Sequence, residues 1–203
     1  MRGADADIGS RTKLLAPTAR YLQWYPAEGD VSIRPGWFYH QEQQRKTPAQ
    51  LMNLYEKSVG RSASLLLNVP PGRDGRIADA DVTSLTAFGK AVRSTYGTDV
   101  RRTQGPGPYT FDRVAVREDI RQGQRVEKFA VEARIDGSWQ RIAEGTTIDN
   151  RRILPLASPV TATTVRVKVL ESRAAPHLGG DHAAPEFGRM SRRPRVRGHP
   201  RSR

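Results

Sequence analysis

The chain has 203 residues, a formal net charge of +13 and a hydrophobic fraction of 36%. It contains no Cys, which excludes disulfides, thiolate metal sites and a cysteine nucleophile from these residues. Its four His do not pair at metal-ligand spacing and no run of eighteen apolar residues occurs, so we expect no metal site, no cofactor and no membrane span.

The first 13 residues carry charges of both signs and lack an apolar stretch, so no signal peptide is expected there. Residues 24–40 then combine aromatic side chains, two carboxylates, an Arg and a His around a Pro-Gly turn. Sugar sites use this mixture, because aromatic faces meet C–H patches while charged groups hold hydroxyls. The alternative is a packed core loop in which Arg34 pairs with Glu28 or Asp30. Composition taken alone favours this alternative.

Residues 47–97 read as helix, strand and helix. Thr47, Pro48 and Gln50 predict a capped helix start, and Gly60 the stop. The apolar run 65–69 predicts a strand buried on both faces, as in parallel sheets. A second helix is predicted from about residue 79 to 97, with an inward face of Val82, Leu85, Phe88 and Val92.

Residues 109–172 change to a period of two, which indicates antiparallel strands with one buried face. Phe129, Val131, Ala133 and Ile135 alternate with charged residues, and residues 136–137 (Asp-Gly) predict a tight hairpin turn. Val165, Val167 and Val169 form another such strand, and Trp139 is expected in the core. The zone is most simply part of a sandwich, with too few strands to complete one.

Residues 98–108 contain Gly-Pro-Gly-Pro and are predicted to be a linker. Residues 173–203 lose all periodicity and are expected to be a disordered basic tail. Eight Arg against Asp181 and Glu186 give this tail +6 of the net charge, while the other +7 is scattered. Because aromatic and basic residues do not interleave, no specific nucleic-acid binding is predicted.

The residues quoted above carry a family resemblance. The run WYPAEGDVSIRPGWFYH, from Trp24 to His40, closely resembles the W-x-P-x-E-x-D-V-S-I-R-P-G-W-F-Y-H segment of the α-L-fucosidases of glycoside hydrolase family 29. The similarity continues through residues 55–61 and 65–71. Residues 111–126 and 145–148 resemble the discoidin-like β-sandwich that follows the barrel in such enzymes.

The resemblance implies an α/β fold, a partial (β/α)₈ barrel in residues 1–97, followed by the linker, an all-β sandwich fragment in 109–172 and the tail. It implies retaining hydrolysis of terminal α-L-fucosyl linkages in glycans, through an Asp nucleophile and a Glu acid/base. In the family both lie before the segment that begins at Trp24, the nucleophile in a Trp-Phe-Asp-Gly-like strand end. No such motif occurs here. We therefore assign no catalytic residue and expect a truncated chain that is inactive alone.

Glu28 and Asp30 lie two apart in an extended segment and so face the same way. Displacement needs attack from the face opposite the acid, which excludes them as the catalytic pair. By resemblance they contact the second sugar, and Trp37 forms the aromatic wall against the fucose methyl group. Trp24 and His40 complete the predicted substrate-binding set for a fucosylated glycan.

Two other functions stay open. The chain could be a non-catalytic glycan-binding remnant that uses the β-sandwich. It could also be a protein whose basic tail binds nucleic acid, but phosphate attraction by residues 189–203 would be nonspecific and strongly salt-dependent.

Overall fold

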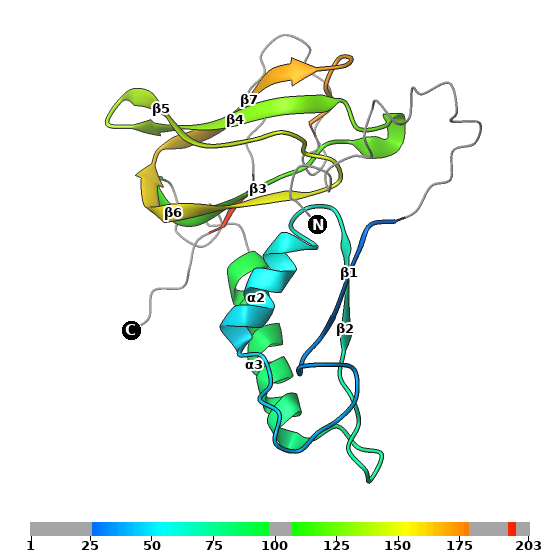
Figure 1. The fold of residues 1–203 in the computed structure, drawn as a ribbon. Helices are drawn as coiled ribbons and strands as arrows, with labels where there is room; N and C mark the ends of the chain where they lie inside the picture. The colour runs from blue at the N-terminus through cyan, green and yellow to red at the C-terminus, as the bar shows by residue number, and fades with distance from the viewer. Residues whose placement is uncertain (1–25, 98–106, 179–194, 198–203) are drawn as a thin grey trace, which may run out of the picture.

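The structure is a computed structural model that describes residues 26–97, 107–178 and 195–197. Among the described residues β-strand is the most common regular structure, and there are two α-helices (Figure 1). Helices α2 (Pro48–Lys57) and α3 (Asp79–Tyr96) and a small sheet form the lower layer of Figure 1, and two further sheets lie above them. Trp24, most of the predicted linker and most of the predicted tail lie outside the described residues.

The small sheet pairs β1 (Glu28–Ser32) in parallel with β2 (Ser64–Asn68). Gly29 faces the carboxyl end of α2, because a Cβ added to it would lie 3.0 Å from the Cβ of Ser58, the residue that caps this helix. The prediction that β2 is buried on both faces is wrong, since Leu66 is 51% exposed. Among the described residues β1 is the only strand paired with β2, so the other edge of β2 has no hydrogen-bonded neighbour.

Helix α2 (Pro48–Lys57) begins as predicted, with a complete capping box between Thr47 and Gln50. It ends at Lys57, three residues before the Gly60 expected to stop it. Helix α3 (Asp79–Tyr96) ends at Gly97 as predicted, but Val82 is 45% exposed and does not belong to its inward face. The helices pack through aromatic contacts, with the Tyr55 ring 6.3 Å from that of Phe88 and 5.6 Å from that of Tyr96.

The other two sheets have three strands each. One has the order β6 (Arg152–Ala162), β3 (Tyr109–Val116) and β8 (Arg195–Arg197). The other has the order β5 (Ser138–Gly145), β4 (Val126–Ile135) and β7 (Thr164–Ser172). A short 3₁₀ helix, Ile120–Gln122, joins β3 to β4. Their facing sides share one apolar core, which includes Phe111, Val114, Phe129, Val131 and Val167. The period-two prediction is confirmed for β7, in which Val165 and Val167 are buried and alternate with more exposed residues. In β4 the predicted residues Phe129, Val131 and Ala133 are buried, but Ala130 and Glu132 on the other face are buried too, so the prediction of a single buried face is wrong for this strand.

The hairpin between β4 and β5 turns at Asp136 and Gly137, whose φ angles of 48° and 80° are those of the predicted tight turn. The placement of Trp139 in the core is wrong. Trp139 is 39% exposed, and the guanidinium of Arg166 lies 4.0 Å from its ring centroid. The register pairs Trp139 with Arg134, on the face of the sheet that points away from the core.

Part of the predicted tail is described. Residues 195–197 form β8, which pairs antiparallel with β3. The expectation of a disordered tail is therefore wrong for these three residues. An isolated bridge also joins Leu178 to Glu118. The remaining residues after 178 lie outside the described part of the chain.

The helices and the upper sheets meet at a polar and aromatic junction. Ser62 Oγ accepts from the Arg151 amide at 2.9 Å, and the Ile153 amide donates to the Gly60 carbonyl at 2.7 Å. Tyr96, Ala115 and Ile153 form a second buried cluster across this junction. The two layers are therefore joined by backbone hydrogen bonds and by shared apolar burial.

Candidate substrate-binding loop

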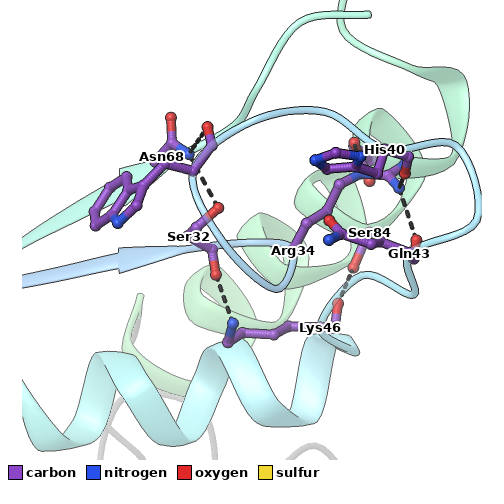
Figure 2. Close-up of polar contacts among 9 residues, drawn as sticks. Ser32, Arg34, His40, Gln43, Lys46, Asn68 and Ser84 are labelled. Atoms are coloured by element: carbon purple, nitrogen blue, oxygen red, sulfur yellow. Dashed lines mark hydrogen bonds and ion pairs between the residues drawn. The ribbon is translucent and has the colours of Figure 1, made fainter.

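The stretch that carries the quoted motif forms a loop at the carboxyl ends of β1 and β2 (Figure 2). We call residues 33–46 the Trp37 loop. Its two ends are close, because the Ile33 amide donates to the Asn68 carbonyl at 2.9 Å and the Lys46 amide to the Ile33 carbonyl at 2.7 Å. Carboxyl ends of parallel strands are the usual place for binding loops in α/β folds.

Arg34 holds the loop from inside. Its side chain is buried, and its Nε donates to Oδ2 of Asp81 on α3 at 2.8 Å. Its Nη1 donates to the carbonyls of His40 at 3.1 Å and Gln43 at 2.7 Å. The guanidinium carbon also lies 4.7 Å from the ring centroid of Tyr39. One buried cation therefore fixes three points of the loop and joins it to α3.

Asn68 and Lys46 anchor the loop to the strand ends (Figure 2). Asn68, the last residue of β2, donates from Nδ2 to Ser32 Oγ and to the Trp37 carbonyl, both at 3.0 Å. Lys46 Nζ donates to the Ser32 carbonyl at 2.6 Å, and Ser84 Oγ donates to the Lys46 carbonyl at 2.8 Å. The Trp37 backbone therefore lies beside the end of β2.

The tip of the loop presents large side chains to solvent. Trp37 is 50% exposed and Phe38 is 80% exposed. His40 is also exposed, and its Nδ1 lies 3.9 Å from the carboxylate of Glu42, which is the edge of ion-pair distance. An exposed indole can stack on a sugar ring, and an imidazole and a carboxylate on the same loop can bond its hydroxyls.

Glu28 and Asp30 are both exposed while Gly29 between them is less so, which confirms that they share one face of β1. Glu28 is the first residue of the strand, about 13 Å from its carboxyl end at roughly 3.3 Å per residue. Trp37 and His40 therefore lie on the same loop, whereas Glu28 and Asp30 lie along the strand. Arg34 pairs with Asp81, so neither carboxylate takes the place considered for it in a core loop.

Sequence reasoning missed Asp81, Asn68 and Lys46. Asp81 lies in the first turn of a helix, 47 residues from Arg34, where an acidic residue is ordinary and gives no sign of a buried partner. Asn68 could have been found, because a polar residue that directly follows an apolar strand lies at the sheet edge where sites form. Lys46 acts through both its backbone and its side chain, which no local pattern indicates.

Among residues 26–97 and 107–178 no three His, Asp or Glu side chains gather in a way that could hold a metal ion. Neither α2 nor α3 is long and apolar enough to cross a membrane.

Comparison with known proteins gives one consistent result. The α-L-fucosidase family model matches residues 16–96. The α-L-fucosidase 1 of Arabidopsis thaliana is 31% identical over 198 aligned residues, which cover 75% of this chain and 39% of the plant protein. The chain thus spans about two fifths of the length of that relative.

Solved structures agree. A glycoside hydrolase 29 family member from a rumen bacterium is 35% identical with a TM-score of 0.73, and the match covers 89% of this chain and 34% of that one. A Ruminococcus gnavus GH29 fucosidase mutant in complex with fucose is 26% identical with a TM-score of 0.66, covering 77% and 40%. The similarity thus extends through both layers of the fold.

Proposed function

Since the chain is related in sequence and structure to the α-L-fucosidases of glycoside hydrolase family 29, we propose that it is the end of such an enzyme's catalytic barrel together with part of the following β-sandwich. The whole enzyme would hydrolyse terminal α-L-fucosyl linkages of glycans with retention. The single observation that carries the proposal is the anchored Trp37 loop, at the carboxyl ends of two parallel strands in a family-related chain.

The order of elements supports the barrel assignment. Strand β1, helix α2, strand β2 and helix α3 follow one another, and the two strands are parallel neighbours. This is the repeating unit of a (β/α)₈ barrel, whose binding loops follow the carboxyl ends of its strands. Residues 109–172 then form two sheets over a common core, as expected of the discoidin-like sandwich.

In this proposal Trp37 forms an apolar wall against the fucose ring and its methyl group, and His40 bonds a hydroxyl. Glu28 and Asp30 contact the second sugar from the uncovered face of β1. Trp24, which precedes the described residues, is assigned to the same substrate by resemblance alone. The fucosylated glycan is thus the partner to which these side chains are suited.

We assign no catalytic carboxylate to this chain and expect no hydrolysis by it alone. Glu28 and Asp30 share one face of β1, whereas a retaining mechanism needs the nucleophile and the acid on opposite sides of the scissile bond. The chain also spans about two fifths of the plant relative. Binding of the sugar without turnover is therefore the expected behaviour of the isolated chain.

The test is a titration of the full chain with L-fucose, followed by tryptophan fluorescence. Trp37→Phe should abolish a saturable change, while Trp139→Phe should retain it, because Trp139 lies on β5, outside the Trp37 loop. Hydrolysis of an aryl α-L-fucoside is measured in parallel and should stay at the buffer rate.

The opposite pattern, with the response lost in Trp139→Phe and kept in Trp37→Phe, would place the sugar on the β-sandwich and support the glycan-binding alternative. Turnover of the aryl fucoside by the chain alone would contradict the absence of a catalytic pair. No saturable response in any of the three proteins would remove the sugar-binding role of the loop.

A further inference from the structure

We propose that Asp81, on helix α3, is a positioning residue that sets the orientation of Trp37 and His40 by way of Arg34. The inference rests on the proposed sugar-binding role of the Trp37 loop for its functional meaning, but not for its geometry. Asp81 itself is fully buried and is linked to the loop through its hydrogen bond from Arg34.

The first argument is the fork of hydrogen bonds made by one rigid group. A guanidinium is planar, so fixing Nε on one acceptor also fixes the direction in which Nη1 points. Asp81 Oδ2 accepts from Nε at 2.8 Å, and Nη1 then meets the carbonyls of His40 and Gln43 at 3.1 and 2.7 Å. The carboxylate therefore determines where the loop backbone is held.

The second argument is burial. The Arg34 side chain is 4% exposed and that of Asp81 is 0% exposed. Among the described residues Oδ1 of Asp81 has no hydrogen-bond partner, so its charge depends on Arg34 for compensation. A buried pair of this kind is costly to break by removing one partner, which makes the link stiff.

The third argument is how little else restrains the tip of the loop. Trp37 and Phe38 are half exposed or more. Among the described residues, the other contacts within residues 35–45 are the Asn68 bond to the Trp37 carbonyl, the Gln43 amide bond to the His40 carbonyl and the exposed His40–Glu42 pair. Without the Arg34 fork the aromatic tip would keep one anchor at Trp37 and lose its tie to the core.

Quenching is measured in the full chain with Trp24→Phe and Trp139→Phe, so that Trp37 is the only tryptophan, and fucose affinity is measured in the chain that retains Trp24. Into both parents we introduce Asp81→Asn, which retains the shape but removes the charge, and Arg34→Lys, which retains the charge but lacks the planar fork. Asp79→Asn is the matched control, since Asp79 lies in the same helical turn and is exposed.

Two readouts are taken, acrylamide quenching of Trp37 and affinity for L-fucose. Asp81→Asn and Arg34→Lys should each raise the quenching constant at least about twofold. They should weaken fucose binding about tenfold, as expected when one charge-assisted hydrogen bond is weakened. Asp79→Asn should match the parent in both readouts.

Unchanged quenching in Arg34→Lys, with a parent-like circular dichroism spectrum, would overturn the proposal, and this variant decides the matter if Asp81→Asn does not fold. An equal rise of the quenching constant in Asp79→Asn would also overturn it, since the rise would then come from the loss of any carboxylate in the first turn of α3. If the parent that retains Trp24 binds no fucose but quenching rises in the two variants only, the positioning role stands and the sugar-binding proposal fails.

Discussion

Glu56 on α2 and Arg113 on β3 form an ion pair that joins the two layers of the molecule, with Arg113 Nε 2.5 Å from Oε1 of Glu56. The same oxygen accepts a hydrogen bond from the Tyr96 hydroxyl of α3. Burial disfavours the charged guanidinium, but its hydrogen bonds to Glu56 and Asp112 outweigh this and raise the pKa of Arg113. One carboxylate thus connects two helices and a strand.

Replacement of Glu56 by Ala should destabilise the protein by about 2–3 kcal/mol, because it leaves a half-buried Arg113 without its closest acceptor. Urea denaturation measures the free energy of unfolding. Glu144→Ala serves as control, since Glu144 pairs with Arg141 at 3.4 Å on the surface and should change stability by no more than about 0.5 kcal/mol. Equal effects of the two changes would contradict a special role for the junction.

Tyr96 makes this junction sensitive to high pH. Burial, aided by the hydrogen bond to Glu56 and by its charge, raises the pKa of the Tyr96 phenol above its ordinary value. The folded state therefore keeps this proton to a higher pH than the unfolded chain does. The stability that the neutral Tyr96 phenol contributes is complete below about pH 10 and is lost as the pH rises above it. Between about pH 10 and 11 the unfolding free energy of the native chain should fall more steeply than that of Tyr96→Phe, which has no phenol to ionise. Parallel profiles would refute this coupling.

Asp119 and Arg121 give a prediction at the opposite end of the pH scale. The Arg121 guanidinium donates hydrogen bonds to the Asp119 carboxylate and lowers the pKa of Asp119 to about 2. Because this pKa is depressed, the associated stability is present above about pH 4 and is lost as pH falls towards 2. A carboxyl NMR titration should show the low pKa, and Arg121→Ala should move it back towards the ordinary value. Arg117→Ala is the control and should leave it low.

Gly145 on β5 is packed against the core in a way that forbids a side chain. A Cβ there would lie 2.8 Å from Cε1 of Phe129, whose ring is fully buried. Gly145→Ala should cost about 1–3 kcal/mol, the usual result of overpacking a core. Thermal and urea unfolding test this, with Ser138→Ala on the same strand expected within about 0.5 kcal/mol of the native chain.

The features that the sequence predicted well are those with local causes. The capping box at Thr47 and Gln50 and the Asp136-Gly137 turn depend on residues within four positions of one another. The Glu28–Asp30 face follows from the alternation of any extended strand. These rules act before tertiary contacts form, so they can be read without knowledge of the fold.

The errors have tertiary causes. Leu66 and Val82 were expected to be buried from their patterns, but burial needs a neighbouring layer that the described residues do not supply at those faces. Trp139 was expected in the core, whereas the pleat directs it outward onto Arg166. The partner of Arg34 lies 47 residues away, a distance at which no pattern pairs one carboxylate rather than another.

The buried cluster of Tyr96, Ala115 and Ile153 has a consequence for how the molecule comes apart. It draws on helix α3 and on strands β3 and β6, with Met52, Tyr55 and Val92 packed against it. Leu51 is the only fully buried apolar residue within α2, so the helical pair owes much of its burial to the sheets. The helices and the sheets therefore behave as one cooperative unit, in which slow amide exchange in β3 and in α2 would report the same opening event.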